Sequence, residues 1–171
     1  ARAVRGVTNS NGGSASASAS IFAFATSHGF AGSTRATGYS NSVSVIAGEG
    51  GTMQRDYAWH SARHLADLEA PDEIGTRASA RAVARLNPVS IKPGVMPVLF
   101  DPRVATTLLG HFVAAISGSA IARQASFLLD ALETQVFAPG VTVHDDPFRK
   151  RGLRSRAFDG EGLPVQPMDL V

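Results

Sequence analysis

The chain has 171 residues and no cysteine, so one ordinary domain or parts of two are expected and disulfides are excluded. Charged residues make up only 18% of the chain and hydrophobic residues 44%, which excludes a disordered chain kept open by charge. The net charge of +2 is too small to indicate a dedicated phosphate-binding surface. The longest uncharged stretches are interrupted by Gly, His and Ser, so we expect no membrane span.

The first 51 residues are rich in Gly, Ser and Ala, and their only charged side chains are Arg2, Arg5, Arg35 and Glu49. Small polar and apolar residues alternate over 15–26 and 39–47, and this period of two predicts half-buried strands. Glycines at 29–32 and 48–51 indicate turns between antiparallel strands. We therefore expect a sheet of small residues with open edges, such as 41–47, that invite pairing with a second chain.

The hydrophobic period changes from two to the 3.6 residues of a helix near Asp56. Further along, the apolar runs at 95–100 and 141–143 indicate short strands. The combined pattern predicts the α/β class in its α+β form, a largely antiparallel small-residue sheet packed with several helices. The helices are predicted over residues 61–68, 71–87, 102–117 and 119–134.

Local signals define the starts and buried faces of two of these helices. Pro71 followed by two acidic residues suits a first helical turn, and Asp101 before a proline is an N-cap signal. The residues predicted to be buried are Ile74, Ala78, Ala82 and Leu86 in the first helix, and Val104, Leu108, Leu109, Phe112, Val113 and Ile116 in the second.

His60 and His64 are the most specific hint of a metal site, because histidines four residues apart share one face of a helix, as in zinc peptidases. Those enzymes place a glutamate directly after the first histidine to activate the zinc-bound water, whereas here Ser61 follows it. Arg63 would also bring a cation beside the metal, and no cysteine is present to complete the ligands. We therefore favour solvated or capping histidines; the alternative is a self-sufficient metallopeptidase that uses this pair.

The one basic cluster of the sequence lies near its end and comprises Arg149, Lys150, Arg151, Arg154 and Arg156. No aromatic residues alternate with these side chains, so a solvated loop is favoured over contact with nucleic acid. The sequence contains neither a phosphate-binding loop nor a Gly-x-Ser-x-Gly nucleophile motif. From the residues alone, catalytic chemistry is not visible.

Six short motifs give the sequence a more specific character: residues 26–30, 45–49, 53–57, 110–118, 126–130 and 158–162. In this order, and over essentially the full chain, they resemble the TldD/PmbA family and, within it, the PmbA-like members that are also called TldE. The motif positions whose roles we leave open are Arg55, Asp56, Tyr57, His111, Ser126, Asp159, Glu161 and Gly162.

The resemblance implies a place for the chain within a longer protein. Family members are much longer, and the chain begins without Met and ends without a helix cap, so we interpret it as an internal, central fragment. On this interpretation residues 1–140 form the central α/β region, and residues 141–171 are the start of a truncated C-terminal domain.

The resemblance also implies a function. TldD is taken as the catalytic subunit of a cytoplasmic proteolytic system and carries a His-Glu-x-x-x-His zinc motif, whereas PmbA-like subunits lack the motif and pair with TldD. In the matching helix of this chain Gly110 replaces the first His, His111 the Glu and Ala115 the second His. The resemblance thus implies a non-catalytic subunit without a cofactor, and zinc in the TldD partner. His111 is then expected to have a structural or interface role, the alternative being a metal ligand.

The expected partners are a TldD-like metallopeptidase subunit and a peptide or unfolded protein substrate, and we also expect a homo-oligomer. The family is linked to maturation of a microcin-type peptide and to turnover of a gyrase-toxin antidote, whence the name modulator of DNA gyrase. A second alternative is therefore a module that binds gyrase or DNA through Arg149–Arg156, which the low net charge disfavours.

Overall fold

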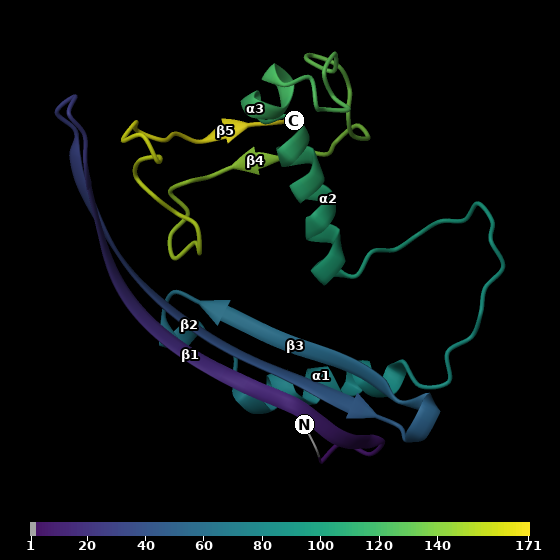
Figure 1. Ribbon diagram of the computed structural model, residues 1–171. Coiled ribbons are helices and arrows are strands. Elements are labelled where there is room, and N and C mark those ends of the chain that lie inside the picture. Colours follow the sequence, from purple (N-terminus) through teal and green to yellow (C-terminus); the bar gives the residue numbers. More distant parts are fainter. Residues whose placement is uncertain (1–2) are drawn as a thin grey trace. The chain divides into compact units, whose positions relative to one another are not determined.

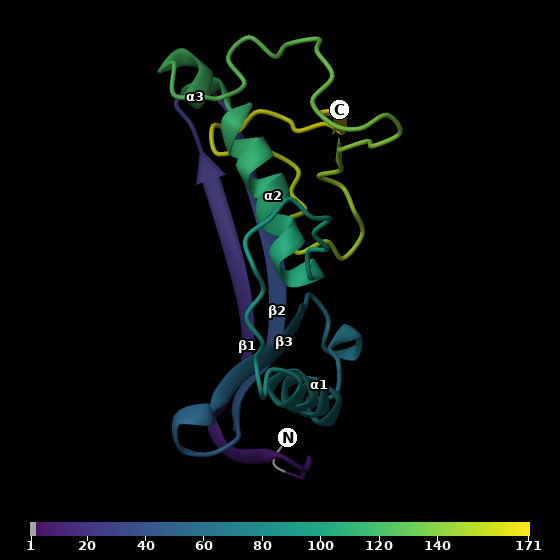
Figure 2. The same ribbon diagram turned by 90° about the vertical axis from the view of Figure 1, so that its right-hand side faces the viewer.

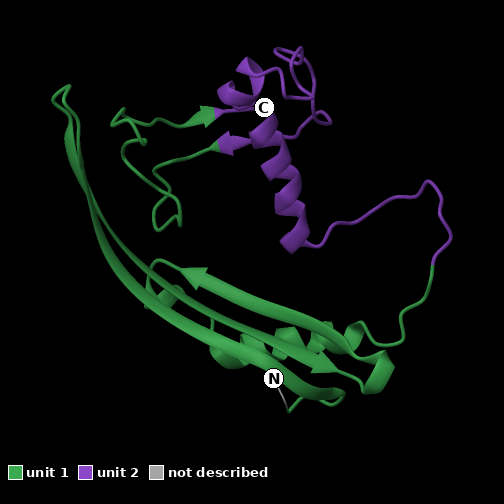
Figure 3. Cartoon of the chain, viewed as in Figure 1, with its two compact units in different colours: residues 1–90, 145–168 green, residues 91–144, 169–171 purple. Residues whose placement is uncertain are grey.

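The computed structural model describes residues 3–171, which divide into two compact units (Figure 3). Unit 1 comprises the chain up to Ser90 together with Asp145–Met168, and unit 2 comprises Ile91–His144 and Asp169–Val171. None of the helices within residues 3–171 is long and apolar enough to cross a lipid bilayer.

Unit 1 is built on an antiparallel sheet of three strands in the order β1-β2-β3 (Figure 1). The strands are β1 (Val7–Ala25), β2 (Ala31–Ala47) and β3 (Gln54–Ala62), and short 3-10 turns follow β2 and β3 at Gly50–Thr52 and Leu65–Asp67. The alternation of small residues makes this possible, because it lets two long strands pair closely. Ser14 meets Ser42 and Ser16 meets Ser40 across the hairpin, each pair of Oγ atoms lying 2.8 Å apart.

Helix α1 (Pro71–Ala84) covers one face of the sheet where the second half of β2 pairs with β3 (Figure 2). Pro71 occupies the first turn, and Asp72 and Glu73 face the positive end of the helix dipole, as the sequence predicts. The core of unit 1 lies between this helix and the sheet, and it comprises Val45, Ala47, Ala58, Ile74, Ala78 and Ala82, with Val7, Val43, Val83 and Leu86 packed against it.

Unit 2 contains α2 (Pro102–Ala115) and the short α3 (Gly118–Ala122). The Asp101 carboxylate accepts a hydrogen bond from the Arg103 backbone N–H at 2.9 Å, which confirms the predicted N-cap. Phe112 and Phe137 meet edge to face with ring centroids 5.1 Å apart. The two-residue strands β4 (His144–Asp145) and β5 (Met168–Asp169) pair with each other, and each has one residue in unit 1 and one in unit 2.

The α+β class is confirmed, but the change of period near Asp56 is not where the helices begin. Residues 54–62 form β3, and the helix predicted over 61–68 is wrong. The alternation was hidden because the side facing α1 carries Asp56, Ala58, His60 and Ala62, small or polar residues, whereas Tyr57 and Trp59 lie on the opposite, more exposed side.

Three further predictions of elements are wrong. The helix expected over 119–134 is limited to Gly118–Ala122, and residues 95–100 and 141–143 are not strands. The predicted buried stripe of the second helix is also wrong, since only Phe112 of its members is buried. Amphipathic spacing shows which side of a helix is apolar, but burial needs an opposing surface.

The open edge predicted at residues 41–47 is wrong because this segment lies in the central strand. Asn41–Ala47 pairs with β1 on one side and with β3 on the other. The edges of the sheet are therefore β1 and β3.

Candidate functional site

The motif Arg55-Asp56-Tyr57 lies in β3, where alternate residues point to opposite faces of the sheet. Asp56 is 6% exposed and opposes the core residue Val45 on the side covered by α1. Its Oδ1 accepts the Tyr57 backbone N–H at 2.7 Å, and Arg85 Nη1 lies 3.7 Å from Oδ2. A buried carboxylate needs such partners, so Asp56 fixes the end of α1 against β3.

His60 lies two residues further along the same face and takes part in a polar cluster before the start of α1. Its Nδ1 accepts the Glu69 backbone N–H at 3.2 Å, and Asn41 Nδ2 donates to the Glu69 carbonyl at 3.4 Å. The Glu69 carboxylate pairs with Arg77 of α1. The hydrogen bond from Arg77 lowers the pKa of Glu69 below its usual value, and the charge of Arg77 lowers it further against the effect of burial.

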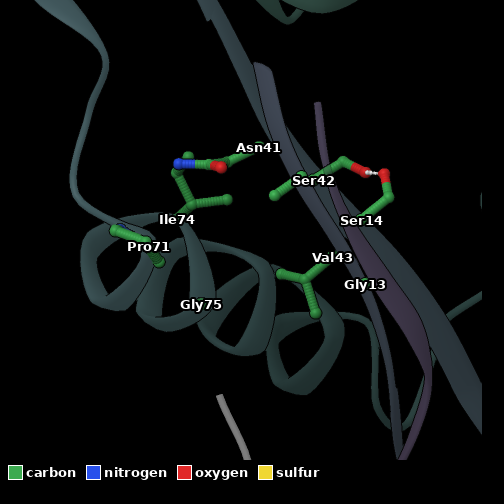
Figure 4. A pocket seen from close by; sticks show the side chains of 9 residues that line it. Gly13, Ser14, Asn41, Ser42, Val43, Pro71, Ile74 and Gly75 are labelled. Atoms are coloured by element: carbon green, nitrogen blue, oxygen red, sulfur yellow. Dashed lines mark hydrogen bonds between the residues drawn. The ribbon is translucent and has the colours of Figure 1, made fainter. Parts of the chain in front are cut away.

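A pocket of about 410 Å³ lies beside this cluster, between the β1–β2 hairpin and the start of α1 (Figure 4). None of its nine lining residues carries a titratable side chain, so the pocket offers shape and apolar surface rather than acid–base chemistry. The lining residues are Gly13, Ser14, Ala15, Asn41, Ser42, Val43, Pro71, Ile74 and Gly75.

The His60 and His64 pair does not have the helical arrangement that the sequence predicts. His60 lies in β3, and His64 follows the strand, with its backbone in the extended conformation before the turn at 65–67. His111 lies on the exposed side of α2 in unit 2. Within residues 3–171, no three His, Asp or Glu side chains are grouped as a metal site would need.

Two motifs that lie far apart in the sequence meet at the turn of the β1–β2 hairpin. The rings of Phe30 and Phe158 pack edge to face with centroids 5.0 Å apart. Gly162 has φ +87° and lies so close to Phe30 that a Cβ there would be 2.7 Å from Cδ1 of the ring. A residue with a side chain would be strained at this position, so Gly162 is required for the loop to dock on the hairpin.

Asp159 shapes the same loop through its side chain. Its Oδ1 accepts the backbone N–H groups of Glu161 and Leu163, each at 2.9 Å. The hydrogen bond from Leu163 and then that from Glu161 lower the pKa of Asp159. Ser126 makes a comparable local contact in unit 2, where its Oγ accepts the Leu128 N–H at 2.9 Å. These motif residues hold turns and are not arranged as a nucleophile and its base.

The basic cluster at 149–156 is attached to the end of β3. Arg63 donates through Nε to the Gly152 carbonyl at 3.3 Å and through Nη2 to the Leu153 carbonyl. Arg151 pairs with Asp67, its Nη1 lying 2.7 Å from Oδ1. The charge of Arg151 is thus paired within unit 1, and the backbone of the cluster is held there by Arg63.

Sequence reasoning missed the residues that organise this region. Asn41, Arg63, Glu69 and Arg85 act through backbone groups or partners far away in the chain, and no local pattern marks them. A strand assignment for 54–62 would have placed Asp56 and His60 on the buried side and drawn attention to their partners.

Comparison with known proteins identifies the family. The PmbA/TldA metallopeptidase central domain matches residues 1–86, and the PmbA/TldA metallopeptidase C-terminal domain matches residues 93–171. The chain belongs to the PmbA/TldD family. The metalloprotease PmbA of Escherichia coli O157:H7 is 37% identical over 96% of this chain, and the PmbA homologue of Haemophilus influenzae is 36% identical over the same share. The chain spans 37% of the length of each of these relatives.

Solved structures of similar proteins support the fold. A protein from Bacteroides thetaiotaomicron described as a modulator of DNA gyrase covers 99% of this chain with a TM-score of 0.91 and 26% identity, and the chain covers 38% of it. A protein of the same description from Thermotoga maritima covers 85% with a TM-score of 0.77 and 28% identity, and the chain covers 33% of it. TldE from Thermococcus kodakarensis has the same fold, with a TM-score of 0.71 at 20% identity over 93% of this chain and 36% of its own.

The two family domains meet between residues 86 and 93, and the two compact units divide at Ser90. The division predicted from the sequence lies at residue 140 instead. The segment 145–168 belongs to unit 1 by its contacts, although it lies within the match to the C-terminal domain.

Proposed function

We propose that this chain is part of a PmbA/TldE-like subunit of a TldD/TldE-type zinc metalloprotease system. In this role the subunit holds no catalytic metal itself and works beside a TldD-like subunit that carries the zinc. The membership of the chain in a family of metallopeptidases supports a role in a protease system. The finer assignment, as the non-catalytic member, rests on the residues of α2.

The observation that carries the assignment is the composition of α2 between positions 110 and 115. A His-Glu-x-x-x-His motif needs two imidazoles and one carboxylate there, and the chain supplies Gly110, His111 and Ala115. Ala115, at the position of the second histidine, is a buried alanine of α2 and carries no group that could bind a metal. His111 alone provides one of the three or four ligands that a zinc ion requires.

The proposed contribution of this subunit is to bind peptide or unfolded protein and to shape the site of cleavage, in the cytoplasm. The pocket beside Asn41 and Ile74 supports a binding role, because it is apolar and lacks groups for catalysis. The substrates proposed from the family are a microcin-type precursor peptide and an antitoxin.

Metal analysis of the purified chain tests the assignment. We expect less than stoichiometric zinc after dialysis, and no change in zinc content in the variants His60→Ala, His64→Ala and His111→Ala. A stoichiometric ion that is lost in His60→Ala would instead support a self-sufficient metallopeptidase. A second measurement, co-purification with a TldD-type metallopeptidase, is expected to yield a complex that cleaves peptides only while the partner's zinc motif is intact.

The alternative function is a module that binds DNA gyrase or nucleic acid through Arg149–Arg156. It is kept because two structural relatives are described as modulators of DNA gyrase. It requires DNA binding that weakens steeply with salt and is lost in Arg149→Ala/Arg154→Ala. Arg154→Ala leaves the Arg151–Asp67 pair intact, so a loss of binding would not reflect a detached loop.

A further inference from the structure

The outer edge of β1 is the longest unpaired strand edge in the described residues. β1 runs over Val7–Ala25 and pairs only with β2. All its side chains from Asn11 to Ala23 are exposed, and none of its residues is charged or a proline. Charges, prolines and covering segments are the usual means by which proteins prevent an edge strand from pairing with another chain. β1 has no charged residue and no proline, and its side chains from Asn11 to Ala23 are not covered.

The opposite edge of the sheet shows how such protection looks. β3 has only nine residues and includes Arg55, Asp56 and His60. The Arg81 guanidinium donates to the Tyr57 carbonyl at 3.4 Å, so a polar group of this strand is already occupied. The contrast points to β1, and not β3, as the edge that accepts a further strand.

The hydrogen-bond pattern of the hairpin decides which residues of β1 are available. The Thr26 N–H donates to the Phe30 carbonyl at 2.9 Å, and the ladder continues from there with Ala25 opposite Ala31. Because hydrogen-bonded and non-hydrogen-bonded pairs alternate in an antiparallel ladder, the even-numbered residues from Ser14 to Phe24, where the register is unbroken, bond to β2. Odd-numbered residues from Ala15 to Ala23 therefore direct their N–H and C=O groups to the open edge.

We propose that β1 pairs with β1 of a second copy of this chain, antiparallel and with the two-fold axis at Ala17. This register places Ala17 opposite the partner's Ala17 and Ala15 opposite the partner's Ala19, and it uses the outward N–H and C=O groups of these residues. It also places Ser16 opposite the partner's Ser18 and Ser14 opposite the partner's Ser20. The sequence from Ser14 to Ser20 reads the same in both directions, so every side chain meets its own kind.

The same chemistry already exists inside the chain on the other side of β1. Ser14 and Ser16 form hydroxyl pairs with Ser42 and Ser40 at 2.8 Å. Small side chains bring no bulk that would keep the second strand away, and two copies related by a two-fold axis satisfy each other equally. The contact is one pair of strands, smaller than the standard interface, so we expect a weak dimer that dissociates on dilution.

This inference does not depend on the proposed protease role, since it concerns contacts between copies of the chain. The test uses Ala17→Glu and Ala17→Lys in the full 171-residue chain, because only at the axis does a residue face itself. Each variant alone places like charges opposite each other at the axis. Its dimer dissociation constant is expected to rise about fivefold, which corresponds to ~1 kcal/mol for one cross-strand pair. An equimolar mixture of the two places Glu opposite Lys and is expected to restore the dimer.

Sedimentation velocity over a dilution series at low and high salt measures the effect. Ala80→Glu and Ala80→Lys are the matched controls, because Ala80 is an exposed alanine of α1 away from this edge, and they should dimerise like the unmodified chain. Ala17→Pro, which removes the N–H at the axis without removing a bond to β2, should abolish the dimer. A monomer at every concentration would overturn the proposal, as would a dimer that Ala17→Glu leaves unchanged or a mixture that does not recover.

Discussion

Helices α1 and α2 have the same length, 14 residues, but they differ in how far the chain covers their apolar sides. α1 buries Ile74, Ala78 and Ala82 against the sheet. α2 buries Phe112 and Ala115, while Leu108, Leu109 and Val113 are 45–50% exposed. Both helices have a proline start and an apolar stripe, so the difference lies in the opposing surface. A stripe becomes core only where the same chain supplies a sheet to receive it.

The units differ in the same way outside the helices. Unit 2 leaves several large apolar side chains almost fully exposed, among them Val95, Leu99 and Leu132. Segments with little buried apolar area open at a low free energy, whereas core elements open only with global unfolding. We therefore expect the cooperative stability of the chain to reside in unit 1. The single tryptophan, Trp59, lies in β3 and reports on unit 1 alone.

The largest expected effect is the loss of the Ile74 side chain. Ile74 is 1% exposed at the centre of the core, so Ile74→Ala should lower the free energy of unfolding of unit 1 by about 2–5 kcal/mol. Leu99→Ala, at a side chain that is 99% exposed, should change it by less than ~0.5 kcal/mol. Urea unfolding followed by Trp59 fluorescence gives both values. Equal losses in the two variants would show that the units share one core.

A smaller effect is expected at the loop that docks on the hairpin. Gly162→Ala forces a side chain into a backbone conformation with φ +87° and against the ring of Phe30, which should cost about 1–3 kcal/mol. Gly160→Ala is the matched control, because nothing lies within 4 Å of its added Cβ and its φ is not positive.

Limited proteolysis at residues 158–162 together with Trp59 fluorescence distinguishes local from global loss. Gly162→Ala should be cleaved faster in the loop, whereas Gly160→Ala should match the unmodified chain. Equal cleavage of both variants would mean that the contact between Phe30 and Phe158 does not hold the loop in place.

Parts of the fold could be predicted wherever a local rule was sufficient. The alternation of Ser and Ala predicted the hairpin, although both strands begin earlier than expected, at Val7 and Ala31. Pro71 and Asp101 predicted the starts of α1 and α2, and the buried positions Ile74, Ala78 and Ala82 were correct. These features depend on neighbours within a few residues, which a sequence displays directly.

The rest depends on contacts between distant segments. β3 was missed because its buried side carries Asp56 and His60, whose burial is tolerable only with Arg85 and the Glu69 backbone N–H as partners. The docking of the loop at 158–162 on Phe30 joins segments more than a hundred residues apart. Rules based on the spacing of residues within one element do not predict such a contact. The candidate pocket arises from the same long-range packing of α1 on the hairpin.

The smallest expected effect is a pH dependence of the stability of unit 1. It comes from the Glu69–Arg77 pair in the polar cluster before α1. Arg77 lowers the pKa of Glu69 below its ordinary 4.5. A carboxyl group whose pKa is lower in the folded state stabilises the fold above its unfolded pKa, and this contribution is lost as the pH falls through the folded pKa. The exposed fractions of the two side chains, 37% for Arg77 and 32% for Glu69, limit the contribution to below ~1 kcal/mol because solvent screens the pair.

Glu69→Gln should therefore reduce the free energy of unfolding near neutral pH and make no difference below the folded pKa, where the carboxyl group is protonated in both states. Urea unfolding by Trp59 fluorescence at a series of pH values measures the convergence of the two curves. Glu49→Gln serves as the control, since it removes a carboxylate from the exposed turn after β2. Parallel curves for Glu69→Gln and the unmodified chain across the acidic range would contradict the role of Arg77. The residual slope of the Glu69→Gln curve would then belong to other carboxylates such as Asp159, whose lowered pKa acts in the same direction.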